Sequence, residues 1–306
     1  MKLEGIHHIT AITAEAQPNV DFYAGVLGLR LVKKTVNQDD PSVYHLFYAD
    51  EQGDAGSDIT FFEFPGVPKG RAGDGMVHTV GWRVASDEAL DFWAERLGQH
   101  DTASERNDEG LRFEDPEGLA HQLAVSTVDD QPLIADHPDV PSELALQGFD
   151  HARAYSSRPE ASEGLLETLA FQHRDGLWEA RGESRGGLWA YDEPPAERGL
   201  QGAGTVHHIA WASPIEEHEA WREKAIEGGA QPTPVIDRFY FRSIYFREPS
   251  GVLFEIATLG PGFSADEPQE TLGEKLSLPP DYEHLREQVE ERLTPIVNPR
   301  QSAARN

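Results

Sequence analysis

Residues 206–211 read VHHIAW and residues 248–257 read EPSGVLFEIA, and these two runs decide the fold. Each is apolar over the length of a strand, and turn residues separate them, so both are predicted strands of one small sheet. His208 lies near the start of the first strand and Glu255 lies in the last strand. Their side chains are therefore able to meet across the sheet.

The N-terminus repeats the double histidine, because residues 6–10 read IHHIT. A second imidazole from this stretch would join His208 and Glu255 to give two nitrogens and one carboxylate on one side of a metal ion. That set leaves the other side of the metal open and is typical of non-haem Fe(II) oxygenases.

A fourfold repeat organises the rest of the chain. Each unit opens with a short strand that carries one of four histidines, His8, His78, His151 and His208. Helix start and stop signals follow; in the fourth unit, Ser213 and Glu216 predict a capping box and Gly228 predicts the end. Alternating apolar runs then predict strands at 43–48, 59–64, 110–113, 120–125, 188–191, 243–247 and 252–258. The predicted unit is βαβββ.

One βαβββ unit exposes an apolar sheet face that it cannot bury alone, and two paired units close a curved sheet around a cleft. We therefore expect an α+β fold in which four βαβββ units pair into two curved-sheet barrels. The predicted division is 1–130 and 143–262 for the two pairs of units and 263–306 for a C-terminal tail, with pairing of the first and fourth units in space also open. Apolar residues at helical spacing predict a helix over 281–293.

Composition excludes several classes of function. With 26 basic and 54 acidic residues, the net charge of −28 disfavours binding to nucleic acid or anionic membranes. The absence of cysteine excludes disulfides, thiolate metal sites and cysteine nucleophiles. No apolar run long enough to span a membrane and no signal pattern is present, so a cytoplasmic protein is expected. The spread acidic charge favours a halophilic-type surface, a hypothesis that melting curves at low and molar KCl would test.

The units differ in the residues that could bind a metal. An Asp/Glu-Pro-x-Gly turn occurs at 115–118 and at 248–251. Four residues after each glycine stand Gln122 and Glu255, so the second unit lacks the carboxylate. This difference predicts one active metal cleft and one vestigial cleft.

The chain resembles the vicinal oxygen chelate superfamily, which includes glyoxalases and extradiol ring-cleaving dioxygenases, and is most similar to hydroquinone-type ring-cleaving dioxygenases. The motifs that carry the resemblance are HHIT at 7–10, HH at 207–208, the segment 238–245 and LFE at 253–255. Together they span most of the chain but leave the tail uncovered.

The resemblance implies a ligand set, a metal and a reaction. The ligands would be His8, His208 and Glu255, and the metal would be Fe(II), with Mn(II) also possible. The substrates would be O2 and a small aromatic para-diol, such as hydroquinone or a substituted hydroquinone, whose ring is opened. Polar residues around the metal would be His7, Thr10, His207, Arg238 and Tyr245. Of these, His207 is a candidate base, Arg238 a candidate cation and Tyr245 a hydrogen-bond donor to the substrate.

Several alternatives remain open at this stage. If the third and fourth units paired, His151 would replace His8 as a ligand. A fourth ligand from Glu63 would favour a glyoxalase-like isomerase or lyase, and a non-catalytic binding protein of the same fold is a further alternative. Strand alternation predicts that His7 and His207 point away from the metal unless the strand is bent. A homodimer is also expected as a possibility, because sheet edges are exposed.

Overall fold

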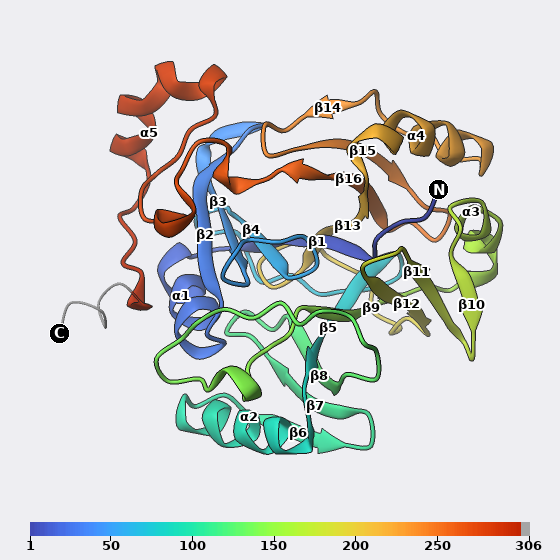
Figure 1. The fold of residues 1–306 in the computed structure, drawn as a ribbon, viewed down its shortest axis with the longest axis horizontal. Helices are drawn as coiled ribbons and strands as arrows, with labels where there is room; N and C mark the ends of the chain where they lie inside the picture. Colours follow the sequence, from blue (N-terminus) through green and yellow to red (C-terminus); the bar gives the residue numbers. More distant parts are fainter. Residues whose placement is uncertain (301–306) are drawn as a thin grey trace.

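The computed structural model describes residues 1–300, and its frame consists of two eight-stranded sheets (Figure 1). In spatial order the first sheet is β14 (Ile236–Asp237), β15 (Phe241–Arg247), β16 (Leu253–Pro261), β13 (Val206–Ser213), β1 (Ile6–Thr13), β4 (Asp58–Glu63), β3 (Asp40–Ala49) and β2 (Arg30–Asn37). The second is β10 (Gln172–Arg174), β11 (Leu177–Arg181), β12 (Gly186–Asp192), β9 (Phe149–Tyr155), β5 (Met76–Val84), β8 (Ala120–Val125), β7 (Gly110–Glu114) and β6 (Ser104–Asn107). The predicted α+β fold of paired βαβββ units is confirmed.

Each sheet has an antiparallel pair of strands at its centre. In the first sheet β1 pairs with β13, so the first and fourth units share one sheet. In the second sheet β5 pairs with β9, which joins the second and third units. The two units of the first sheet are therefore separated along the chain by the whole of the second sheet. The division of the chain at 130, 143 and 262 stays a prediction.

The helices lie on the outer sides of the sheets (Figure 1). They are α1 (Ala16–Val20), continued by a π-helical turn at Asp21–Val26, α2 (Asp87–Gln99), α3 (Glu163–Thr168), α4 (His218–Glu227) and α5 (Arg286–Arg292). The capping box predicted at Ser213 is wrong, because a 3₁₀ turn at Ile215–Glu217 precedes α4 and the Ser213 hydroxyl instead contacts His218 Nδ1 at 3.1 Å. None of the helices within residues 1–300 has the length and apolar content needed to cross a lipid bilayer.

Large aromatic side chains fill the space between the two sheets. Trp211 of β13 and Trp189 of β12 are fully buried, with ring centroids 6.2 Å apart. Phe254 of β16 packs edge-on against Trp189 at 5.1 Å. Because these rings come from both sheets, burying them holds the sheets in a fixed arrangement.

The C-terminal segment runs along the outer edge of the first sheet (Figure 1), and over the predicted helix at 281–293 it forms a 3₁₀ turn at Pro280–Leu285 followed by α5. A buried cation attaches this segment to the sheet. Lys33 of β2 has no exposed side-chain surface, donates to Asp266 at 2.7 Å, and also donates to Glu267, which is 1% exposed. Its Nζ also lies 4.9 Å from the centre of the Tyr240 ring. The tail is thus part of the folded body.

Candidate metal centre

Three buried side chains converge on the first sheet: His8 from β1, His208 from β13 and Glu255 from β16. His8 Nε2 and His208 Nε2 are 3.2 Å apart, and they lie 3.2 Å and 3.0 Å from Glu255 Oε2. Strand pairing explains the convergence. Residues two apart on a strand share a face, and β13 lies between β1 and β16 with His208 beside Thr10 and Ala210 beside Glu255.

The donor set fits a divalent metal ion. Both carboxylate oxygens of Glu255 are buried, and within residues 1–300 neither accepts a well-formed hydrogen bond. Lone pairs so close together repel one another, and leaving them unsatisfied in a buried site is costly. A cation shared by the two imidazoles and the carboxylate removes both penalties. Two nitrogens and one oxygen suit Fe(II) and related ions.

His7 lies beside His8, and not on the opposite face that strict alternation predicts. The register of β1 shifts between Ile6 and His8, so the strand is bent at this point. His7 Nδ1 lies 2.9 Å from His8 Nδ1, and His7 Nε2 lies 3.1 Å from the carbonyl oxygen of Thr258. Burial and the neighbouring His8 lower the pKa of His7 to about 3, so this imidazole is neutral.

These contacts determine the tautomer of His8. A carbonyl can only accept, so His7 Nε2 carries the single ring proton and donates it to Thr258. His7 Nδ1 is then an acceptor and takes a hydrogen bond from His8 Nδ1–H. His8 Nε2 is therefore left with a free lone pair that points toward His208 and Glu255, as a metal ligand requires.

We expect His7→Phe to weaken metal binding by about 10- to 100-fold while the fold is retained, because the aromatic volume stays but the acceptor that orients His8 is lost. Titration of the metal-free protein with Fe(II) or Zn(II) against a chromophoric chelator measures this change. His284→Phe, at an exposed histidine of the tail, is the matched control. An unchanged affinity in His7→Phe would show that the orientation of His8 does not depend on this bond.

His207 makes the same contact with His208 that His7 makes with His8, but the side chain of His207 is exposed. Its Nδ1 lies 2.8 Å from His208 Nδ1, whereas its Nε2 makes no hydrogen bond with any described residue. The side chain is exposed, yet its withdrawal from bulk water and the nearby His208 lower the pKa of His207 to about 4. If His208 Nε2 binds the metal, His208 Nδ1–H donates to His207, and the proton of His207 is then on Nε2.

A cavity of about 490 Å³ lies above the cluster, and we refer to it as the site cavity. That volume is in the range of small-molecule sites. Its walls are largely aromatic, with a few polar groups. The residues that line it include His8, His45, Phe47, Phe62, Phe64, His207, His208, Arg238, Tyr240, Phe241 and Tyr245. His7 and Thr10 are not among them.

Arg238 and Tyr245 form the polar side of the site cavity. Arg238 Nε donates to Tyr245 Oη at 3.3 Å, and its two terminal nitrogens donate to the Asp39 carboxylate at 3.2 and 3.0 Å. Burial alone would lower the pKa of Arg238, but Tyr245 and Asp39 raise it, so the guanidinium group stays protonated. Burial and the nearby Glu255 raise the pKa of Tyr245, so its hydroxyl stays protonated.

Comparison with known proteins shows the family. Residues 5–123 match the model of the Glyoxalase/Bleomycin resistance protein/Dioxygenase superfamily. The sequence is 43% identical to MhqO of Bacillus subtilis (strain 168), which is provisionally named a ring-cleaving dioxygenase; the alignment covers 96% of this chain and 97% of that protein. The chain belongs to this superfamily.

Two further members are similar over almost their whole length. The chlorohydroquinone/hydroquinone 1,2-dioxygenase of Sphingobium indicum is 35% identical, covering 94% of this chain and 95% of that protein. A crystal structure from Bacillus subtilis subsp. subtilis str. 168, also provisionally described as a dioxygenase, is 41% identical with a TM-score of 0.90, covering 97% and 98% of the two chains. The predicted superfamily is therefore confirmed.

The position in the first unit that corresponds to Glu255 holds a threonine. In the fourth unit, the neighbour of the second residue after His208 is Glu255. In the first unit, the neighbour of the second residue after His8 is Thr60, whose hydroxyl bonds Thr10 Oγ1 at 2.8 Å. Glu63 lies further along β4, where it accepts a hydrogen bond from the backbone of Ala16 at 3.0 Å. Glu63, which was considered as a fourth ligand, is therefore not a member of the cluster formed by His8, His208 and Glu255.

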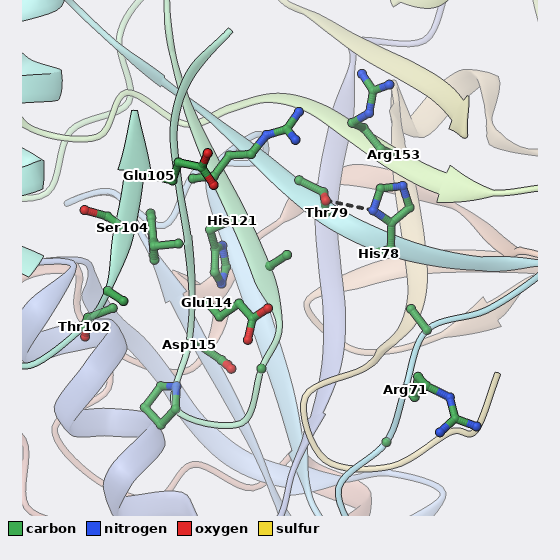
Figure 2. A pocket seen from close by; sticks show the side chains of 18 of the residues that line it. Arg71, His78, Thr79, Thr102, Ser104, Glu105, Glu114, Asp115, His121 and Arg153 are labelled. Atoms are coloured by element: carbon green, nitrogen blue, oxygen red, sulfur yellow. Dashed lines mark hydrogen bonds between the residues drawn. The ribbon is translucent and has the colours of Figure 1, made fainter. Parts of the chain in front are cut away.

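The second sheet carries the corresponding cleft, which we call the second cleft (Figure 2). It is larger, at about 1250 Å³, but its register aligns Thr79 with His208 and Gln122 with Glu255. The alignment of His78 with His208 assumed from the sequence is therefore wrong, and His78 corresponds to His207. Figure 2 shows Thr79 Oγ1 bonded to His78 Nδ1 at 2.9 Å, in the place of the bond between His208 and His207.

His151 lies in β9 of the second sheet and pairs through Nδ1 with Asp150 at 2.8 Å. It is not part of the His8, His208 and Glu255 group, which is the metal-type cluster found within residues 1–300.

His45 lines the site cavity, although the sequence analysis did not identify it as a candidate site residue. The alternating pattern over 43–48 places His45 and Phe47 on one face and was the available signal.

Proposed function

We propose that this protein is a ring-cleaving dioxygenase that uses Fe(II) and O2 to open an aromatic diol, with hydroquinone or a substituted hydroquinone as substrate. The observation that carries the proposal is the buried cluster of His8, His208 and Glu255 beneath a cavity with aromatic walls. The Sphingobium indicum relative, which is named as a dioxygenase of chlorohydroquinone and hydroquinone, supports the substrate class.

His8, His208 and Glu255 would hold the iron, which when bound supplies adjacent positions for a diol oxygen and O2 and a route for electron density between them. Overall, one carbon–carbon bond next to a hydroxylated carbon breaks, and both atoms of O2 enter the product. A para-diol then gives a muconic-semialdehyde-type product. Mn(II) shares the ligand preferences of Fe(II), so it is the metal to compare with iron.

The surrounding residues would manage protons and charge. Arg238 offers a permanent cation that stabilises the anionic oxygens of the substrate and the opening ring. Tyr245 offers a protonated hydroxyl beside Arg238. His207 would present Nε2–H to the site cavity while His208 binds metal, so we assign it as a hydrogen-bond donor, and not as the resting base expected from the sequence.

Anaerobic loading with Fe(II), followed by O2-uptake measurements, tests the proposal. We expect consumption of equal amounts of O2 and hydroquinone, with appearance of a yellow ring-opened product that mass spectrometry identifies by the gain of two oxygen atoms. Zn(II)-loaded protein is the control and should consume no O2. Turnover of catechol without any turnover of hydroquinone would contradict the substrate, and absence of O2 uptake with every diol would contradict the reaction.

We expect Arg238→Ala to lower turnover by about two to three orders of magnitude, because one preorganised donor to a developing anion is removed. Metal content and melting temperature should stay near those of the wild type. Arg238→Lys should recover only part of the activity, since it keeps the charge but loses the planar fork.

An exposed pair outside the site cavity supplies the control for this experiment. Arg106 pairs with Asp87, which is 83% exposed, and exposed ion pairs contribute about 0–1 kcal/mol, so Arg106→Ala should leave activity and stability nearly unchanged. Wild-type turnover in Arg238→Ala would assign this arginine to the surface pair with Asp39 alone.

A further inference from the structure

His45 is a polar group that lies between aromatic side chains in the wall of the site cavity. It lies on β3, and its ring packs between Phe47, with ring centroids 3.9 Å apart, and Phe62, at 4.4 Å. Phe62 in turn contacts the rings of His207 and His208 at 5.5 and 6.4 Å. The His45 ring is therefore next to the metal cluster but is not a member of it.

Two threonines hold the His45 ring in place. His45 Nε2 lies 2.9 Å from Thr60 Oγ1, and Thr60 Oγ1 lies 2.8 Å from Thr10 Oγ1. Thr60 occupies the position in the first unit that Glu255 occupies in the fourth. The threonine at the position that corresponds to Glu255 thus anchors a histidine at the edge of the site cavity. Because hydroxyls donate and accept, this chain is compatible with either neutral tautomer of His45.

The other ring nitrogen of His45 has no protein partner. Nδ1 makes no hydrogen bond with any described residue, although the side chain lines the site cavity. Burial, with the neighbouring His8 and His208, lowers the pKa of His45 well below its ordinary value, so the ring is neutral. A neutral imidazole nitrogen held in an aromatic wall is suited to one hydrogen bond with a hydroxyl group of a bound ring.

We propose that His45 is a specificity-determining residue, which recognises through Nδ1 the hydroxyl of the diol that is not bound at the metal cluster. The inference deepens the proposed function and rests on it. A site built to hydrogen-bond a substrate hydroxyl discriminates against analogues that lack it, because its own polar group is left unpaired. The residue would therefore separate aromatic diols from simple phenols.

Equilibrium binding under anaerobic conditions tests this role without turnover. The probes are hydroquinone and phenol, titrated calorimetrically into Fe(II)-loaded protein. We expect the wild type to bind hydroquinone at least about tenfold more tightly than phenol, a ratio that corresponds to one hydrogen bond in a buried site. In His45→Leu, hydroquinone affinity should fall to that of phenol while phenol affinity changes little. In steady-state assays, the variant should raise KM for hydroquinone more than it lowers kcat.

Two further variants separate recognition from packing. His45→Asn places an amide near the position of Nδ1 and should restore part of the discrimination. Thr60→Val removes the bond to Nε2 at nearly constant volume and should give an intermediate loss. If His45→Leu loses hydroquinone affinity and phenol affinity equally, His45 only packs in the cavity wall and the proposal is overturned. The proposal is also overturned if both His45 variants keep the wild-type ratio of hydroquinone to phenol affinity.

Failure of the proposed function has a different signature from failure of this inference. If the wild-type protein binds neither hydroquinone nor a substituted hydroquinone, the substrate assignment fails and the role of His45 fails with it. If the wild type binds and cleaves hydroquinone but the His45 variants discriminate as it does, the assignment of His45 alone is overturned.

Discussion

Glu255→Gln should bind Fe(II) at least about a hundredfold more weakly than the wild type, more than the loss seen when residues that merely orient a ligand are changed. The substitution keeps the size of the side chain but removes the negative charge that faces His8 and His208 at 3.2 and 3.0 Å. Turnover should fall below detection. Iron content after gel filtration and the metal-dependent rise in melting temperature measure the loss.

The second cleft provides the control for Glu255→Gln. In the second sheet Gln122 occupies the strand position that corresponds to Glu255, beside a strand that carries Thr79 in place of a histidine. Gln122→Ala should therefore leave the iron stoichiometry unchanged. Full iron content in Glu255→Gln, or iron lost from Gln122→Ala at unchanged stability, would contradict the assignment of the metal to the first sheet.

Lys33→Met should lower the free energy of unfolding by about 3–5 kcal/mol, because it leaves the Glu267 carboxylate buried without its cation. Chemical denaturation and melting curves measure the change. The double variant Lys33→Met/Glu267→Leu should regain much of the loss, since an apolar pair of similar volume replaces the ionic one. Lys224→Met, at an exposed pair with Glu227, is the matched control and should cost less than about 1 kcal/mol.

A loss of less than about 1 kcal/mol in Lys33→Met would mean that water reaches Glu267 once the lysine is gone. It would also mean that the C-terminal segment is held mainly by its apolar contacts. Val289 and Leu293, both buried, are the residues of that segment that would then carry the attachment.

The sequence contained most of the fold because its pattern is repeated. Strand alternation and turn residues recur in each unit, so a weak signal in one unit is reinforced by the others. The convergence of His8, His208 and Glu255 likewise follows from strand periodicity once the strands are paired. Their role as ligands stays a prediction until a metal is bound.

Three features could not be read from the sequence, and each depends on geometry that periodicity does not encode. The bend that brings His7 beside His8 is a local register shift, invisible in an unbroken apolar pattern. The alignment of Thr79 with His208 depends on the register of strands and not on the position of the nearest histidine. The place of His45 in the site cavity depends on the register of β3 against β4, which sets His45 beside Phe62.

The pairing of the first and fourth units has a consequence for how the protein is made. The side chains of His8 and His208 meet although they are 200 positions apart. On the ribosome, residues of the second sheet emerge as one continuous stretch and can pair with one another first. The first strand must meanwhile wait, with its apolar faces uncovered, until β13 and β16 have been synthesised. A nascent chain therefore cannot bring His8, His208 and Glu255 together until β16 has been synthesised.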